Sequence, residues 1–79
     1  MLTLYVKTGC PFCAKVLDEM DTLGVQATLK NIADAAVAEE LIARGGKRQV
    51  PYLIDDEHDV EMYESGDVVA YLQTHYVKP

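Results

Sequence analysis

The sequence contains no tryptophan, one phenylalanine, three prolines and two cysteines in 79 residues. Two cysteines that lie three positions apart do not provide the several spaced pairs of a disulfide-rich secreted domain. Basic residues are also few, since 7 lysines and arginines stand against 13 aspartates and glutamates, giving a net charge of −6. A surface of this sign repels phosphate backbones, so we do not expect nucleic acid as a partner.

Long hydrophobic runs are absent as well, and none approaches the ~20 residues that a membrane-spanning helix needs. The apolar start, MLTLYVKTG, is too short for a signal peptide and has no leading basic segment. We therefore expect a cytoplasmic protein with no membrane partner. With 49% hydrophobic and 25% charged residues the composition is that of an ordinary globular protein, and the length predicts one domain, residues 1–79.

Hydrophobic periodicity and turn residues predict the element order β-α-β-α-β-β-α. We expect strands at 2–6, 26–31, 50–54 and 60–63, and helices at 11–23, at 35–44 and from 66 onward. A strand, a crossover helix and a second strand give a parallel pair, and the later hairpin adds antiparallel strands to the same sheet. The predicted fold class is α/β, a four-stranded mixed sheet flanked by three helices that cover both of its faces.

The same pattern predicts how the helices begin and which side chains they bury. Asp34 and Ser65 are the expected N-caps of the second and third helices. The segment DDEHD, residues 55–59, is expected to be a solvated polar turn. The side chains expected to face the core are Val16, Leu17, Met20, Leu23, Val37, Leu41, Ile42, Val68, Val69 and Leu72.

Both cysteines lie in the stretch TGCPFCAK, residues 8–15, and three interpretations of them are open. They are inert buried thiols, or two ligands of a zinc or iron–sulfur site, or a reactive pair. Zinc normally takes four ligands, and there is no second C-x-x-C. The chain has two histidines, of which His58 falls in a polar turn and His75 in the last turn of a helix, where the dipole favours a cation.

The reactive interpretation is favoured by the expected position of Cys10 at the N-cap of the helix that opens at Pro11. Unpaired N–H groups and the positive end of the helix dipole stabilise a thiolate there, and Lys7 adds a positive charge. Such a setting lowers the pKa of a cysteine and makes it a nucleophile near neutral pH. Cys13, one turn further in, is expected to be less exposed and to act as the resolving thiol.

The motif CPFC, the later VP and the helix SGDVVAYL together resemble the glutaredoxins of the thioredoxin superfamily over essentially the whole chain. The resemblance implies a thioredoxin-like fold and a glutathione-dependent thiol–disulfide oxidoreductase that acts in electron transport and cell redox homeostasis. Its substrates would be protein disulfides and protein–glutathione mixed disulfides, with glutathione as co-substrate and no metal. Cys10 would attack, Cys13 would resolve, and Lys7 would assist; we expect a monomer.

The resemblance also implies a set of glutathione-binding residues. Val50 would offer its backbone beside a cis Pro51, Phe12 would form a wall of the groove, and Lys7 would meet the glycine carboxylate. Ser65 would receive the γ-glutamyl carboxylate, and either Glu64 or Asp67 the ammonium. The set is therefore Lys7, Cys10, Phe12, Val50, Pro51, Glu64, Ser65 and Asp67.

Two positions depart from the family pattern. Gln49 stands where threonine is usual, and Tyr63–Glu64 replaces the usual glycine pair. The dipeptide Glu64–Ser65 looks more like the glutathione-binding corner of glutathione transferase N-terminal domains.

Three alternatives remain open at this point. One is a dimer that binds a [2Fe–2S] cluster through Cys10 and glutathione. Another is an electron donor reduced by thioredoxin reductase. The last is a glutathione-transferase-like fragment that binds glutathione without redox cycling.

Overall fold

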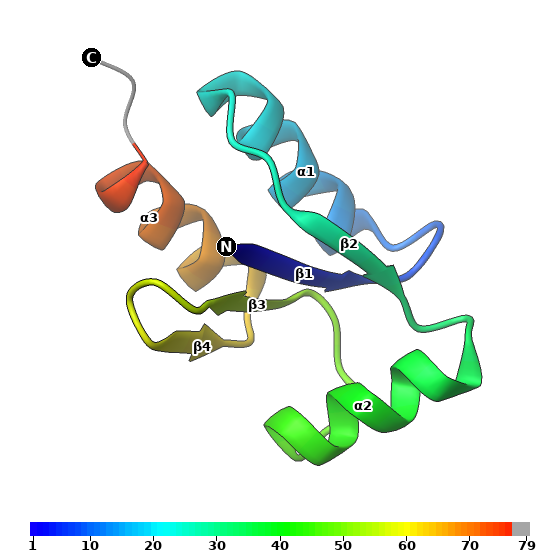
Figure 1. Cartoon of the computed structure of the whole chain (residues 1–79). Helices are drawn as coiled ribbons and strands as arrows, with labels where there is room; N and C mark the ends of the chain where they lie inside the picture. The colour runs from blue at the N-terminus through cyan, green and yellow to red at the C-terminus, as the bar shows by residue number, and fades with distance from the viewer. Residues whose placement is uncertain (77–79) are drawn as a thin grey trace.

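The structure is a computed structural model that describes residues 1–76. Its elements follow the predicted order β-α-β-α-β-β-α (Figure 1). They are β1 (Leu2–Val6), α1 (Pro11–Leu23), β2 (Thr28–Asn31), α2 (Ala35–Gly45), β3 (Tyr52–Asp55), β4 (Val60–Met62) and α3 (Ser65–His75). The predicted fold class is confirmed. The second and fourth strands are shorter than expected, and β3 begins two residues later, because Val50 and Pro51 precede the ladder.

The four strands form one mixed sheet in the order β2-β1-β3-β4. β1 lies in its interior, parallel to β2 and antiparallel to β3, and β3 pairs antiparallel with β4. In the β1–β3 pair, Leu2 lies opposite Asp55 and Tyr5 opposite Tyr52. The end of β1 that leads to Cys10 is therefore one strand length away from Asp55.

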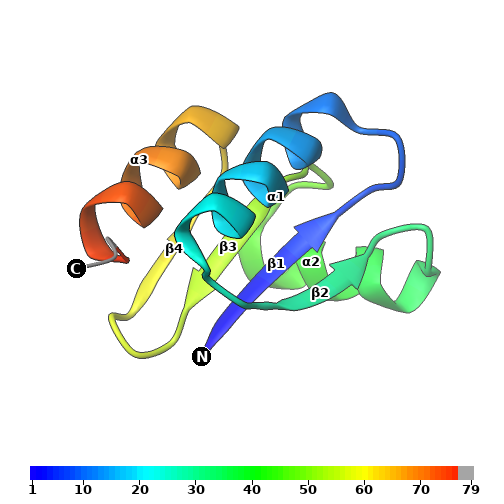
Figure 2. The ribbon, with the colours of Figure 1, turned by 90° about the horizontal axis from the view of Figure 1, so that it is seen from above.

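Helices cover both faces of the sheet, α1 and α3 on one side and α2 on the other (Figure 2). Alternation along the strands separates the two cores, because successive strand residues point to opposite faces. Leu4 and Leu53 pack with Val16 and Leu72 on the α1–α3 side. The side chains buried on the α2 side are Tyr5, Ile32, Ala38, Leu41, Tyr52 and Ile54.

The ends of α1 and α2 follow the predicted capping. Cys10 is the N-cap of α1, with Pro11 in the first turn and Gly24 in the left-handed conformation at the end (φ 69°). Asp34 caps α2 by accepting a hydrogen bond from the Ala36 N–H at 2.9 Å. These ends were predictable because capping depends on residues that are neighbours in the sequence.

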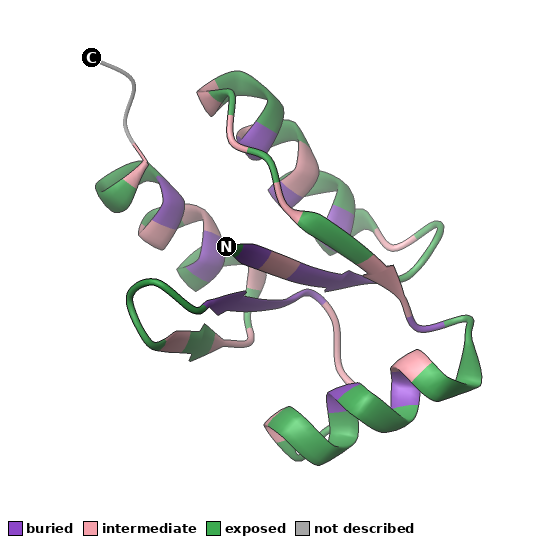
Figure 3. Ribbon diagram, viewed as in Figure 1, coloured by how far each residue is buried: buried purple, intermediate pink, exposed green. Residues whose placement is uncertain are grey.

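Two predictions about the helices are wrong. Ser65 is the first residue of α3 rather than its cap; the N-cap is Glu64, at φ 69°, and no side chain caps this end. Ile42 is 43% exposed, whereas Ala38 and Leu41 are buried. Most of the α2 ribbon has the colour of exposed residues in Figure 3. Ala38 and Leu41 are three positions apart and share one side of the helix, which leaves Ile42 turned past the sheet.

The prediction that residues 55–59 form a solvated turn is also wrong in one respect, because Asp55 is fully buried. One carboxylate oxygen, Oδ2, accepts hydrogen bonds from the hydroxyls of Tyr71 (2.5 Å) and Tyr76 (2.6 Å) and lies 2.8 Å from His58 Nδ1. The other, Oδ1, accepts the Glu57 N–H at 3.2 Å. These donors replace the water that a buried carboxylate loses, so the charge is tolerated.

Within residues 1–76, no helix combines the length and the apolar character needed to cross a membrane.

Candidate active site

Cys10 lies between the end of β1 and the start of α1. Its N–H donates to the Lys7 carbonyl at 3.2 Å, and Gly9 precedes it at φ 82°, a conformation that favours glycine. The Cys10 sulfur accepts a hydrogen bond from the Cys13 N–H at 3.4 Å. The turn therefore directs a partly exposed sulfur at the unpaired N–H groups of the helix start.

The surroundings of Cys10 favour its ionised form. Partial burial opposes ionisation, but hydrogen bonds from the Cys13 N–H and thiol and from the Phe12 N–H, with the charge of Lys7, outweigh it. The pKa of Cys10 is therefore held below its usual value. Lys7 is the smallest of these contributions, so the helix start contributes more to the thiolate than the lysine does.

Cys13 is the opposite case. Its side chain is 2% exposed, and burial raises the pKa of its thiol to about 11; the Lys7 backbone opposes this shift, while hydrogen bonding to Cys10 and its charge add to it. Near neutral pH, Cys13 is thus a protonated thiol beside a sulfur that ionises more easily. Both thiols are free. The unequal pair expected from the sequence is present in the structure.

A hollow of about 250 Å³ lies beside the first turn of α1. Most of the predicted glutathione-binding residues meet there, and the peptide bond between Val50 and Pro51 is cis, as the family resemblance implied. The hollow is lined by Phe12, Gln49, Val50, Pro51, Glu64 and Ser65. Phe12 is 57% exposed, which is unusual for so large an apolar side chain and fits a groove wall rather than a core position.

Three predicted residues lie outside this hollow. Asp67 is an exposed residue in the first turn of α3. Lys7 and Cys10 line a separate hollow on the α1–β2 side, where Thr8 accepts a hydrogen bond from the Asn31 amide at 2.8 Å. The structure therefore separates Lys7 from the residues expected to hold the far end of glutathione, and it favours Glu64 over Asp67 as the acidic group of the hollow.

Gln49 is a site residue that the sequence did not predict. Its amide Nε2 donates to Glu64 Oε1 at 3.2 Å, so both side chains form one wall of the hollow. Glu64 has a positive φ of 69°, which is uncommon for a residue with a side chain. The only signal in the sequence was that Gln49 departs from the family pattern, and the pairing joins residues 15 positions apart.

Tyr63, the other departure, anchors the loop that precedes the hollow. Its hydroxyl donates to the Lys47 carbonyl at 2.8 Å and accepts the Lys47 N–H at 3.1 Å. Its ring lies 4.4 Å from that of Tyr52, and its hydroxyl and ring lie against Gly45. A glycine at this position would leave both backbone groups of Lys47 without these partners.

One family model matches the chain. The Glutaredoxin family model matches residues 2–60. Comparison with curated protein sequences gives no match.

Solved structures of glutathione transferases share the fold. A delta-class glutathione transferase from Nilaparvata lugens is 27% identical, with a TM-score of 0.83 over 100% of this chain and 38% of that one. A glutathione S-transferase from the Antarctic clam Laternula elliptica is 28% identical, with a TM-score of 0.81 over 95% and 35%. A glutathione transferase homologue from sulfitobacter, solved with bound glutathione, is 25% identical, with a TM-score of 0.78 over 96% and 37%.

The chain thus spans little more than a third of the length of these structures. The matched residues include β1 and the start of α1, between which Cys10 lies, and the cis Val50–Pro51 bond. The chain belongs to the glutaredoxin family.

Proposed function

We propose that the protein is a glutathione-dependent thiol–disulfide oxidoreductase that reduces protein–glutathione mixed disulfides and protein disulfides. The observation that carries this proposal is the Cys10 sulfur, held at the start of α1 by the Cys13 N–H at 3.4 Å. A thiolate is the attacking species in disulfide exchange, and a lowered pKa supplies it near neutral pH.

The reaction on a glutathionylated thiol has two exchange steps. The Cys10 thiolate attacks the glutathione sulfur of the mixed disulfide; a Cys10–glutathione disulfide forms, and the substrate leaves as its thiolate and takes up a proton. A second glutathione, as its thiolate, then attacks the glutathione sulfur on Cys10. Glutathione disulfide leaves, and the Cys10 thiolate is restored. Overall, one glutathione thiol is oxidised and the substrate sulfur is reduced, since the other glutathione sulfur arrives already within the mixed disulfide.

Protein disulfides add an internal step. Cys10 first forms a mixed disulfide with one substrate sulfur, and Cys13, after losing its proton, attacks Cys10 and releases the substrate dithiol. Two glutathione thiols then reduce the Cys10–Cys13 disulfide and leave as glutathione disulfide. Because the pKa of Cys13 is raised to about 11, the internal step is slower than it would be for an ordinary thiol. In the reaction on a glutathionylated thiol, slow attack by Cys13 leaves the Cys10–glutathione disulfide to react with a second glutathione.

Glutathione fits the hollow beside the first turn of α1 by its chemistry. The cis Val50–Pro51 segment offers backbone groups to an extended peptide, as in strand-like recognition. The start of α3 at Ser65 presents unpaired N–H groups to the γ-glutamyl carboxylate. Glu64 offers its carboxylate to the ammonium. Lys7 acts on Cys10 and on the leaving substrate rather than within this hollow.

The test is a pair of matched substitutions assayed with glutathione, glutathione reductase and NADPH. Cys10→Ser should abolish reduction of a glutathionylated peptide, whereas Cys13→Ser should retain it. Full activity of Cys10→Ser would refute the mechanism. Reduction supported by thioredoxin reductase and not by glutathione would favour the electron-donor alternative, and visible absorption after anaerobic purification would favour the cluster-binding dimer.

One observation favours a second candidate, glutathione transfer to an electrophile, because the similar structures are glutathione transferases. Conjugation of glutathione to an aryl halide tests it. If the first proposal is correct, Cys10→Ser removes mixed-disulfide reduction, and the wild type shows no conjugation above the uncatalysed rate.

A further inference from the structure

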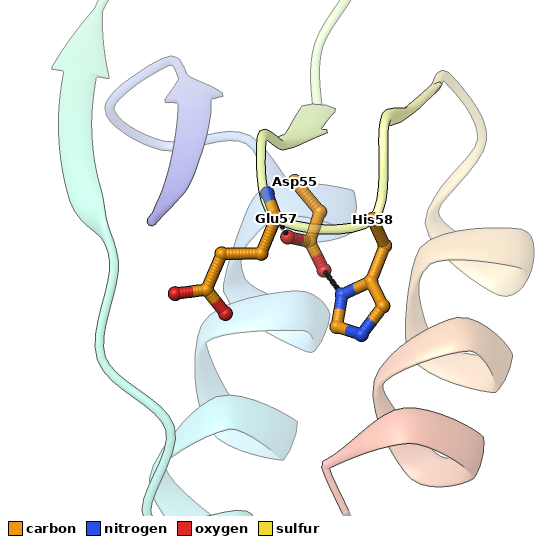
Figure 4. A group of neighbouring side chains, drawn as sticks. All are labelled: Asp55, Glu57 and His58. Carbon is orange, nitrogen blue, oxygen red and sulfur yellow. Dashed lines mark hydrogen bonds and ion pairs between the residues drawn. The ribbon is translucent and has the colours of Figure 1, made fainter.

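His58, in the turn between β3 and β4, is oriented by the buried Asp55 carboxylate. Its Nδ1 lies 2.8 Å from Asp55 Oδ2 (Figure 4). A carboxylate can only accept hydrogen bonds, so neutral His58 carries its proton on Nδ1 and keeps its lone pair on Nε2. A carboxylate that fixes an imidazole in this way is the usual outer-shell partner of a metal-binding histidine.

His75, in the last turn of α3, brings a second imidazole next to that of His58. Its ring centroid lies 5.7 Å from that of His58 and 4.5 Å from that of Tyr71, against which it packs. Two imidazoles whose nitrogens lie about 2.0 Å from one tetrahedral metal ion have centroids roughly 5 Å apart. The observed separation is close to this value, and both histidines are exposed.

We propose that His58 and His75 bind one divalent transition-metal ion of the kind that prefers imidazole, with Zn²⁺ as the representative case. Asp55 orients His58 and is not itself a ligand, since its two oxygens already serve Tyr71, Tyr76, His58 and the Glu57 N–H. Water, or the exposed carboxylate of Glu57 after rotation, fills the remaining positions. The bound ion would link the β3–β4 turn to the end of α3.

This site is separate from the proposed thiol chemistry. Asp55 lies opposite Leu2, the first residue of β1, while Cys10 follows the other end of that strand at Val6. Four residue steps of a strand correspond to about 13 Å. Metal binding at the histidines therefore neither requires nor blocks the reaction at Cys10.

The experiment is calorimetric titration of the full chain with Zn²⁺ in a Cys10→Ser, Cys13→Ala background, which removes the competing thiols. One ion per chain is expected. Loss of an outer-shell partner typically lowers metal affinity by about 10- to 100-fold. In this background, His58→Gln and His75→Gln should each lower the Zn²⁺ affinity by more than that. Asp55→Asn, checked for folding by circular dichroism, should weaken it by about 10- to 100-fold.

A matched control keeps the number of histidines constant. The double variant Gln73→His, His75→Gln moves the second imidazole two positions along α3, to a different side of the helix. It should bind as weakly as His75→Gln alone. In NMR spectra, the imidazole signals of His58 and His75 should shift together when Zn²⁺ is added. No binding, binding unchanged in either histidine variant, or full binding by the control would each overturn the proposal.

Discussion

Replacing Asp55 by asparagine removes a buried charge and leaves its shape almost unchanged. Three donors, from Tyr71, Tyr76 and His58, converge on one oxygen, and the Glu57 N–H binds the other. A hydrogen bond to a charged group contributes about 1.5–3 kcal/mol and a neutral one about 0.5–1.5 kcal/mol, so each of the three is weakened by about 1 kcal/mol. The amide NH₂ also faces the Glu57 N–H, which cannot accept.

The expected loss is therefore about 3 kcal/mol in the free energy of unfolding at pH 7. For a domain of this size that corresponds to a fall in Tm of about 12–24 °C. Thermal and urea unfolding followed by circular dichroism measure both quantities. Asp56→Asn is the matched control, because Asp56 is an exposed neighbour of Asp55. Its Oδ1 forms only a weak ion pair with the Arg44 guanidinium, at 3.8 Å. That change should shift Tm little.

The effect has a defined pH dependence. Burial alone would raise the pKa of Asp55, but hydrogen bonds from Tyr71, Tyr76 and His58, with the charge of His58, hold it well below the ordinary value. Its stabilisation is thus fully present above the ordinary pKa of about 3.9 and is lost as the pH falls below it. The difference between wild type and Asp55→Asn should shrink from pH 5 to pH 2. An equal difference at pH 7 and pH 2.5, or one under about 1 kcal/mol at pH 7, would refute this reasoning.

Further predictions concern the active site and its loop. The rate of Cys10 alkylation should rise with pH with a midpoint below the ordinary value of about 8.5, and a midpoint there would contradict a helix-stabilised thiolate. Gln49→Thr should raise KM for glutathione about fivefold, because Glu64 loses a hydrogen bond of ~1 kcal/mol that holds it in place. The value of kcat should stay unchanged, and a fall in kcat alone would exclude this positioning role. Gly45→Ala should lower stability to urea by about 1–3 kcal/mol, because the new methyl group overlaps Tyr63, and unchanged stability would show that this ring moves freely.

Both ends of α1 were predictable from the sequence because their determinants are local. Cys10 is the N-cap, Pro11 lies in the first turn and Gly24 is the C-cap, each at the expected place. In the structure, alternation along β1 and β3 divides their side chains between the two helical layers. The element order followed from these signals.

The burial of Asp55 was not predictable in this way. The segment DDEHD has the composition of an exposed turn, and four of its five residues are exposed. Asp55 is buried against two tyrosine hydroxyls, one from Tyr71 in α3 and one from Tyr76 just after that helix, 16 and 21 positions away. No local pattern marks such a contact, since a tyrosine packs equally well with its hydroxyl in water.

The start of α3, beside the hollow, was likewise not predictable from local sequence. Ser65 has the residue type of an N-cap, yet Glu64 takes that position with a positive φ that residue preference disfavours. Glu64 is in turn bonded to Gln49. Which side chain begins α3 is thus decided by the path of the chain out of β4 and not by the cap preference of serine.

The interior position of β1 has a consequence for folding. Its two neighbours come from different parts of the chain: β2 pairs with it after a single crossover, whereas Leu2 meets Asp55 only when about fifty residues have been closed into a loop. A chain ending after α2 would leave one edge of β1 and the apolar face toward α3 open to water. We therefore expect no stable half-molecule, and a single cooperative transition in which the last third of the sequence completes the sheet that the first residues began.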